Sequence, residues 1–134
     1  MTRAPPALML AIAGCAHAPA LPSPPGFARS KEKAAEVCLP PGEQAYLTGL
    51  RCADGTVPVT KRMGSVGTRL TPADPNDPRI LLQMDPERPL QKGEPDLHIV
   101  DAFEARCGGA TYTLFVDMYH CPAPPQPAPD GLRR

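Results

Sequence analysis

The chain has 134 residues, which is enough for one domain and hardly for two. Lysine plus arginine and aspartate plus glutamate both total 14, so the formal net charge is zero, and this balance argues against nucleic acid as a partner. Hydrophobic residues make up 42% of the chain, which permits a packed core, and the 20 prolines are about three times the usual share.

A short apolar segment near the start of the chain ends at a cysteine. Arg3 and the free amine supply a small positive region, and residues 4–14 form an apolar stretch that is too short to span a bilayer as a helix. The stretch ends in the letters IAGC at residues 12–15. This segment resembles the lipobox of bacterial lipoprotein precursors, in which a branched apolar residue and two small residues precede a cysteine that becomes lipidated.

The resemblance implies that residues 1–14 are removed as a signal peptide and that Cys15 then carries the lipid and an acylated amine. Two or more acyl chains anchor a protein stably to a membrane, whereas one chain holds it only marginally. In such proteins an aspartate after the cysteine favours retention at the inner membrane, and here Ala16 follows, which implies an outer-membrane anchor facing the periplasm. The alternative is an ordinary signal peptide, cleaved near Ala16 or Ala18, that leaves a soluble periplasmic protein.

Proline-rich segments flank the part of the chain that can build a core. After the lipidated cysteine, residues 16–29 are rich in proline and predict an extended tether. The last segment has a similar composition and predicts disorder. The sequence therefore predicts a signal peptide over 1–14, a lipidated tether over 15–29, a globular domain over 30–121 and a proline-rich disordered tail over 122–134.

The first elements predicted in the globular domain are a helix and a hairpin. Residues 30–37, SKEKAAEV, predict one short helix that the two prolines at 40–41 should end. Residues 44–52 and 56–63 are rich in strand-forming residues and flank an Asp-Gly pair, which predicts a hairpin. Pro58 cannot donate a ladder hydrogen bond, so the second of these strands should be bulged or lie at an edge.

Two loops follow the predicted hairpin, over residues 71–79 and 85–96. The apolar piece between them, ILLQM, fits either a short helix or a short strand.

The strongest predicted element is a second hairpin, formed by residues 96–107 and 110–121 around Gly108-Gly109. A Gly-Gly pair permits the positive φ that a two-residue turn requires. With Cys107 opposite Ala110, one face of this hairpin is nearly all apolar and should meet the core. That face carries Leu97, Ile99, Phe103, Ala105, Tyr112, Leu114, Val116, Met118 and His120.

The opposite face of this hairpin is more polar and should be at least partly wet. It carries His98, Glu104, Arg106, Thr111, Thr113, Asp117 and Tyr119, together with Val100 and Phe115. Asp101 falls on the apolar face, where a lone buried charge is costly, so we expect either that it pairs with Lys61 or Arg62 or that the face is exposed there.

Five cysteines are an odd number, but a lipidated Cys15 leaves four, which can form two disulfides. Cys107 and Cys121 lie at opposite ends of one predicted strand, about 40 Å apart, which excludes a bond between them. Cys52 and Cys107 each precede a predicted turn, so an up-and-down sheet places both at the same end. The favoured pairing is therefore Cys52–Cys107 with Cys38–Cys121.

His98, Asp117 and Tyr119 share one face of the second hairpin and are the only candidates for catalysis. A histidine beside a carboxylate is the minimum of an acid–base site, but no nucleophile is identifiable beside them, and cross-strand polar pairs explain the triplet more simply. The cysteine spacings do not fit a zinc site, and there is no phosphate loop or hydrolase motif. We therefore expect no metal and no cofactor.

The sequence as a whole predicts a β-rich, small α+β fold: an antiparallel sheet of two or more hairpins, one short N-terminal helix and two disulfides. The function it favours is a lipid-anchored binding or scaffold domain in the bacterial envelope, with a membrane contact through Cys15 and an envelope protein as partner. The competing class is an envelope hydrolase that uses the face of His98 and Asp117.

Overall fold

The computed structural model describes residues 20–70 and 74–134, so the lipobox segment and Cys15 lie outside the described residues. Within the described part, no helix has the length and apolar character needed to cross a membrane.

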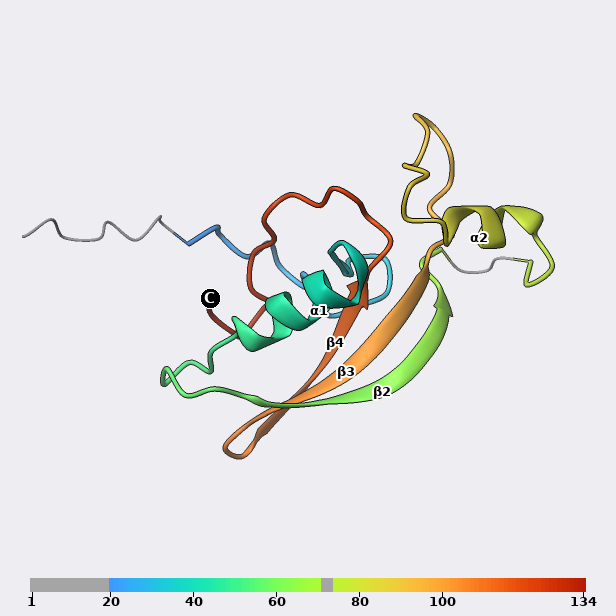
Figure 1. The fold of residues 1–134 in the computed structure, drawn as a ribbon. Helices are drawn as coiled ribbons and strands as arrows, with labels where there is room; N and C mark the ends of the chain where they lie inside the picture. Colours follow the sequence, from blue (N-terminus) through green and yellow to red (C-terminus); the bar gives the residue numbers. More distant parts are fainter. Residues whose placement is uncertain (1–19, 71–73) are drawn as a thin grey trace, which may run out of the picture.

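A four-stranded mixed sheet forms the centre of the fold (Figure 1). Its strands are β1 (Ala35–Glu36), β2 (Val59–Thr68), β3 (Ile99–Cys107) and β4 (Ala110–Asp117), in the spatial order β1-β4-β3-β2. β1 runs parallel to β4, and the other two pairs are antiparallel. Two short helices, α1 (Leu39–Thr48) and α2 (Pro78–Gln83), complete the small α+β fold. The β-rich, disulfide-linked fold class predicted from the sequence is confirmed.

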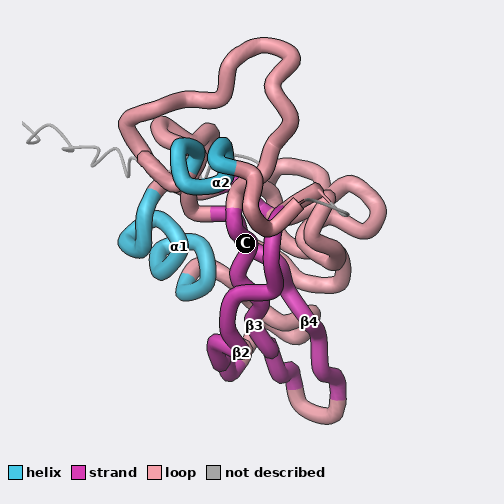
Figure 2. The backbone as a smooth tube through the Cα atoms, turned by 90° about the vertical axis from the view of Figure 1, so that its right-hand side faces the viewer, coloured by secondary structure: helices cyan, strands magenta, loops and turns pink. Residues whose placement is uncertain are grey.

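The hairpin of β3 and β4 has the predicted register. Cys107 lies opposite Ala110, and the pairing continues without a shift to Asp101 opposite Val116. Gly108 adopts a φ of 56°, a left-handed conformation that glycine accepts without steric cost. Figure 2 shows this turn at one end of the sheet, while the long loops gather at the other end. β4 ends at Asp117, four residues before the end of the predicted strand, and this early end determines where His120 lies.

The core lies on one face of the sheet and contains the predicted apolar side of the hairpin. α1 and the C-terminal segment cover this face. The buried members of the cluster are Ala28, Ala35, Val37, Tyr46, Leu47, Leu50, Phe103, Ala105, Leu114, Val116, Ala128 and Leu132.

The first predicted hairpin is not formed, because its first strand is part of a helix. α1 occupies residues 39–48, and the prolines at 40–41 lie in its first turn instead of ending an earlier helix. The amide donors of a first turn have no partner within the helix, so proline loses nothing there. The Asp-Gly pair does make a turn, but the turn joins the end of α1 to the approach of β2.

The predicted helix over residues 30–37 is also wrong. This segment forms tight turns and then β1, in which Ala35 pairs with Val116 of β4. Ala34 and Ala35 are fully buried, so their small side chains let the chain pack closely on the sheet. Tertiary packing here overrides a local helix propensity, which is weak over eight residues.

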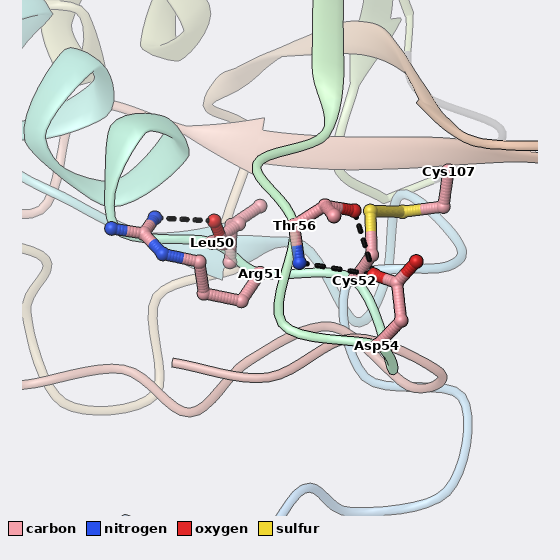
Figure 3. Close-up of a disulfide and its surroundings, with 6 residues drawn as sticks. All are labelled: Leu50, Arg51, Cys52, Asp54, Thr56 and Cys107. Atoms are coloured by element: carbon pink, nitrogen blue, oxygen red, sulfur yellow. Dashed lines mark hydrogen bonds between the residues drawn. A yellow bond between two sulfur atoms is a disulfide. The ribbon is translucent and has the colours of Figure 1, made fainter.

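Two disulfides link the helix region to the hairpin, with the pairing favoured from the sequence. Cys38 bonds to Cys121 and Cys52 bonds to Cys107, with Cα–Cα distances of 4.8 Å and 5.6 Å. Figure 3 shows the second bond beside the turn in which the Asp54 carboxylate accepts hydrogen bonds from the amide and hydroxyl of Thr56. The two bonds lie at opposite ends of the hairpin, as expected, although the first hairpin used in that reasoning does not exist.

Both proline-rich flanks contribute to the domain, which corrects the predicted boundaries. Ala28, placed in the tether, is fully buried, and its carbonyl accepts a 2.9 Å hydrogen bond from the amide of Phe115 in β4. The segment 122–134, predicted to be disordered, folds back over α1, where Arg51 and Arg133 exchange two backbone hydrogen bonds of 2.8 Å. Prolines here fix an extended path along the core instead of leaving the chain unstructured.

Candidate functional site: a histidine–aspartate cluster

Four side chains of types that can ligate metals meet at the end of the sheet that lies opposite the β3–β4 turn. Asp96 and His98 come just before β3, Asp117 ends β4, and His120 follows three residues later. Their ligand atoms all lie within 4.8 Å of one another. We call these four residues the histidine–aspartate cluster.

The early end of β4 explains how His120 joins the cluster. Strict alternation along an extended strand placed this side chain on the apolar face, beside Leu97. After Asp117 the chain leaves the ladder with β3, and Tyr119 forms an isolated bridge with Cys38 instead. The strand alternation is therefore lost, and the His120 ring lies edge-on to the ring of His98 at 4.7 Å. The predicted inward position of His120 is wrong for this reason.

The polar atoms of the cluster make close mutual contacts. His98 Nδ1 lies 3.1 Å from Asp117 Oδ2, 3.1 Å from Asp96 Oδ1 and 3.2 Å from His120 Nε2. His120 Nε2 lies 2.9 Å from Asp117 Oδ2 and 3.2 Å from Asp96 Oδ2. Two ring nitrogens and two carboxylates thus converge on one small volume.

Arg69, just after β2, is the cation beside the cluster. Its Nη1 lies 3.3 Å from Asp117 Oδ2 and 3.4 Å from Asp96 Oδ2. Its Nη2 lies 2.9 Å from a carboxylate oxygen of Glu36 in β1 and donates to the carbonyls of Glu32 and Ala34. These contacts hold the guanidinium at the rim of the cluster. Through them Arg69, which follows β2, contacts β1, the segment that leads into β3 and the end of β4.

His120 and the two carboxylates of the cluster have shifted pKa values. Burial alone lowers the pKa of His120, but its hydrogen bonds to Asp117 and Asp96 outweigh burial and raise that pKa to about 9. Burial raises the pKa of Asp117, yet hydrogen bonds from His120 and His98 hold it well below its usual range. The pKa of Asp96 is lowered in the same way, chiefly by His120 against the effect of burial. Both carboxylates are therefore anionic at neutral pH.

The polar face of the hairpin is exposed to solvent only near the turn. His98 is 1% exposed and Asp117 is fully buried, as are Val100 and Ala102 between the cluster and the middle of the sheet. The prediction that His98 and Asp117 share a face and come within reach is confirmed. The face is partly exposed to solvent, as expected, but its exposed part does not include these two side chains.

The third predicted site residue, Tyr119, lies beside the cluster without joining it. Its ring is 5.7 Å from the ring of His98, in a tilted arrangement. The contacts that the structure gives the rings of His98 and His120 are with carboxylates, Arg69, each other and this ring. None of these partners is a serine or cysteine nucleophile, so the arrangement lacks the triad geometry of a hydrolase.

Two surface hollows adjoin the cluster. One, of about 620 Å³, is lined partly by Glu36 and Arg69, together with prolines and Phe27. The other, of about 210 Å³, is lined by His98, Tyr119 and His120 among other residues. His98 and Asp117 are buried, whereas the side chains of Asp96 and His120 are each 18% exposed, so a small ion could reach the cluster from the second hollow.

Sequence reasoning missed Asp96, Arg69 and His120 as members of this site. A usable signal was present: Asp-x-His over residues 96–98 and Asp-x-x-His over 117–120 lie at the open end of the predicted hairpin. Arg69 had no such signal, because only the tertiary fold brings the end of β2 to this place.

Comparisons of the chain with protein-family models, with curated proteins and with solved structures find no match.

Proposed function

We propose that this protein is a lipid-anchored domain of the bacterial envelope that acts by binding another envelope protein. The proposal joins three features: the lipobox-like segment ending at Cys15, a small disulfide-linked domain, and an exposed sheet edge. The exposed edge carries the binding part of the proposal.

Two disulfides in a small domain support an oxidising compartment. Such bonds persist in the periplasm and outside the cell and are rare in the cytosol. Cys38–Cys121 and Cys52–Cys107 use every cysteine of the described residues. Cys15 is then the one cysteine left for lipidation, as the lipobox resemblance implies.

The edge strand β2 supports protein binding. It ends the sheet, and among the described residues no further strand pairs with its outer side. Its first half, Val59–Arg62, pairs regularly with β3, while bulges follow at Gly64 and beyond. Val59 is 63% exposed and Met63 is 61% exposed. Open backbone groups flanked by exposed apolar side chains suit the addition of a strand from a partner.

The hydrolase alternative has weaker support. His98 and Asp117 do converge, but both are buried and neither contacts a nucleophile. The geometry therefore favours a binding role over hydrolysis.

Two measurements test the two halves of the proposal. Intact mass of the protein purified from envelopes should show an acylated N-terminus at Cys15, and a product that begins elsewhere, or that lacks acyl mass, contradicts the anchor. A photo-crosslinking residue placed at Val59 should capture a discrete envelope protein in living cells. The same residue at Leu81 of α2, which is 76% exposed, serves as the control. Capture of the same products from both positions, or of none from Val59, contradicts binding through β2.

A further inference from the structure

The contacts within the histidine–aspartate cluster cannot all be hydrogen bonds. His98 Nδ1, His120 Nε2 and Asp117 Oδ2 form a triangle with sides of 3.1, 3.2 and 2.9 Å. An imidazole nitrogen carries either one proton or one lone pair. If both nitrogens are protonated, two N–H groups face each other at 3.2 Å; if either is not, its lone pair faces the carboxylate oxygen. With Asp117 anionic, every arrangement of protons on the two rings leaves at least one repulsive side.

A metal ion at the centre would satisfy every side of this triangle at once. In a tetrahedral zinc site the bonds to nitrogen and oxygen are about 2.0–2.1 Å, which separates neighbouring ligand atoms by about 3.3 Å. The three sides of the triangle lie close to that spacing, as do the 3.1 Å from His98 Nδ1 to Asp96 Oδ1 and the 3.2 Å from His120 Nε2 to Asp96 Oδ2. We infer that Asp96, His98, Asp117 and His120 form a binding site for a divalent transition-metal ion of the zinc type.

The surroundings fit an ion of this charge and class. Three carboxylates, those of Glu36, Asp96 and Asp117, surround the site or its rim, and a divalent ion together with Arg69 balances them. Two imidazoles among the ligands favour zinc and similar transition metals over calcium or magnesium, which prefer all-oxygen sites. Arg69 then acts as an outer partner that orients the two carboxylates, as hydrogen-bonded groups around metal sites commonly do.

The site would also serve the fold. The ion would join the start of β3 to the end of β4 and the loop after it, at the end of the sheet opposite the Cys52–Cys107 bond. The hollow lined by His98, Tyr119 and His120 gives an exchange route for the ion. The earlier expectation of no metal depended on cysteine spacing, which does not bear on a site made of histidines and aspartates.

Zinc titration of the full chain tests this inference. The protein, with both disulfides formed, is stripped with a chelator and titrated with Zn²⁺ by calorimetry, and bound metal is counted by elemental analysis after gel filtration. We expect one Zn²⁺ per chain and no measurable binding of Mg²⁺. Co²⁺ in place of Zn²⁺ should give the visible absorption of a four-coordinate nitrogen–oxygen site.

Matched variants locate the ion. His120→Gln should weaken Zn²⁺ binding by at least about 100-fold, since even outer partners of metal sites contribute about 10–100-fold. Asp96→Asn, which removes a carboxylate ligand, should weaken Zn²⁺ binding to a similar extent. His17→Gln, which changes a histidine outside the described residues, and Asp54→Asn, at the far end of the fold, should bind Zn²⁺ like the parent.

Two results would overturn the inference. The first is a folded parent protein that binds no Zn²⁺, which would mean that Arg69 and a protonated His120 are the only cations of the cluster. The second is binding that His120→Gln and Asp96→Asn leave unchanged while both variants keep the parent's circular dichroism. If one variant fails to fold, the other and the Co²⁺ spectrum decide.

Discussion

The guanidinium of Arg62 in β2 holds the carboxylate of Asp101 in β3 through two hydrogen bonds of 2.9 Å, from Nε to Oδ2 and from Nη2 to Oδ1. The Asp101 side chain is 6% exposed and also accepts a 2.8 Å hydrogen bond from the Ser65 hydroxyl. The sequence predicted a basic partner for Asp101 because the residue falls on the apolar face, and this prediction is confirmed.

Replacing Arg62 with alanine should destabilise the fold, because it leaves a buried carboxylate with Ser65 as its remaining partner. Breaking a fully buried pair costs about 3–5 kcal/mol, but Arg62 is half exposed, so we expect a loss of about 1–2 kcal/mol in the free energy of unfolding. Urea denaturation measures it. Arg106→Ala, which breaks the exposed pair with Glu104, is the control and should cost about 0.5 kcal/mol or less. Equal losses in the two variants would contradict the buried role of Asp101.

Glu43 on α1 is expected to be a destabilising charge. It is 8% exposed, and among the described residues its Oε2 has no hydrogen-bond partner. Burial, and then the nearby Asp101, raise the pKa of its carboxyl group. When the pKa of a carboxyl group is higher in the folded state than in the unfolded state, its protonated form favours folding. This contribution to the free energy of unfolding is complete below the unfolded-state pKa and is lost as the pH rises through the folded-state pKa.

Glu43→Gln should therefore stabilise the protein at pH 7, by about 1 kcal/mol, the lower end of the cost of an unsatisfied buried group. Near pH 4 the gain should shrink, because Glu43 itself is then largely protonated. Thermal unfolding at the two pH values measures the difference. Glu87→Gln changes an exposed carboxylate on a loop and should leave the melting temperature unchanged at both. A gain that is the same at both pH values would contradict the electrostatic explanation.

Removing the Cys52–Cys107 bond by double substitution to alanine should lower the free energy of unfolding by about 4 kcal/mol. The two cysteines are 55 residues apart, and closing a loop of that length restricts the unfolded chain by about this amount. The Cys38→Ala/Cys121→Ala variant, with a separation of 83 residues, should lose about as much. Chemical denaturation under non-reducing conditions compares them, and a loss below about 1 kcal/mol in both variants would argue against the entropic explanation.

The elements that the sequence predicted correctly are those with a strong local signal. The β3–β4 hairpin follows from alternating apolar residues around Gly108-Gly109, and its register fixes which residues share a face. That register brought His98 and Asp117 together in the prediction as it does in the structure. The turn at Asp54-Gly55 also follows from local chemistry.

The elements that were predicted wrongly depend on packing between distant segments. α1 starts at a pair of prolines, which suit the first turn of a helix as well as the residues just after a helix. Local sequence does not distinguish these two placements, and the disulfides and core packing select the first. The segment 30–37 forms turns and the short strand β1 because β4 offers Ala35 and Glu36 an edge to pair with. His120 joins the histidine–aspartate cluster because the chain leaves β4 early, where Tyr119 bridges to Cys38, and no local sequence pattern shows this.

The C-terminal segment gives the sharpest test of such packing, because composition predicted disorder where the structure places part of the core. Leu132 is 7% exposed and belongs to the core cluster, and the hydroxyl of Tyr46 donates a 2.9 Å hydrogen bond to the carbonyl of Pro127. Leu132→Ala should therefore cost about 2–3 kcal/mol in the free energy of unfolding, as for other leucines removed from a core. Leu82→Ala, which removes a side chain that is 54% exposed on α2, is the control and should change stability by about 0.5 kcal/mol or less. A disordered tail would make the two variants indistinguishable in urea denaturation, so a difference between them establishes that residues after Cys121 belong to the folded domain.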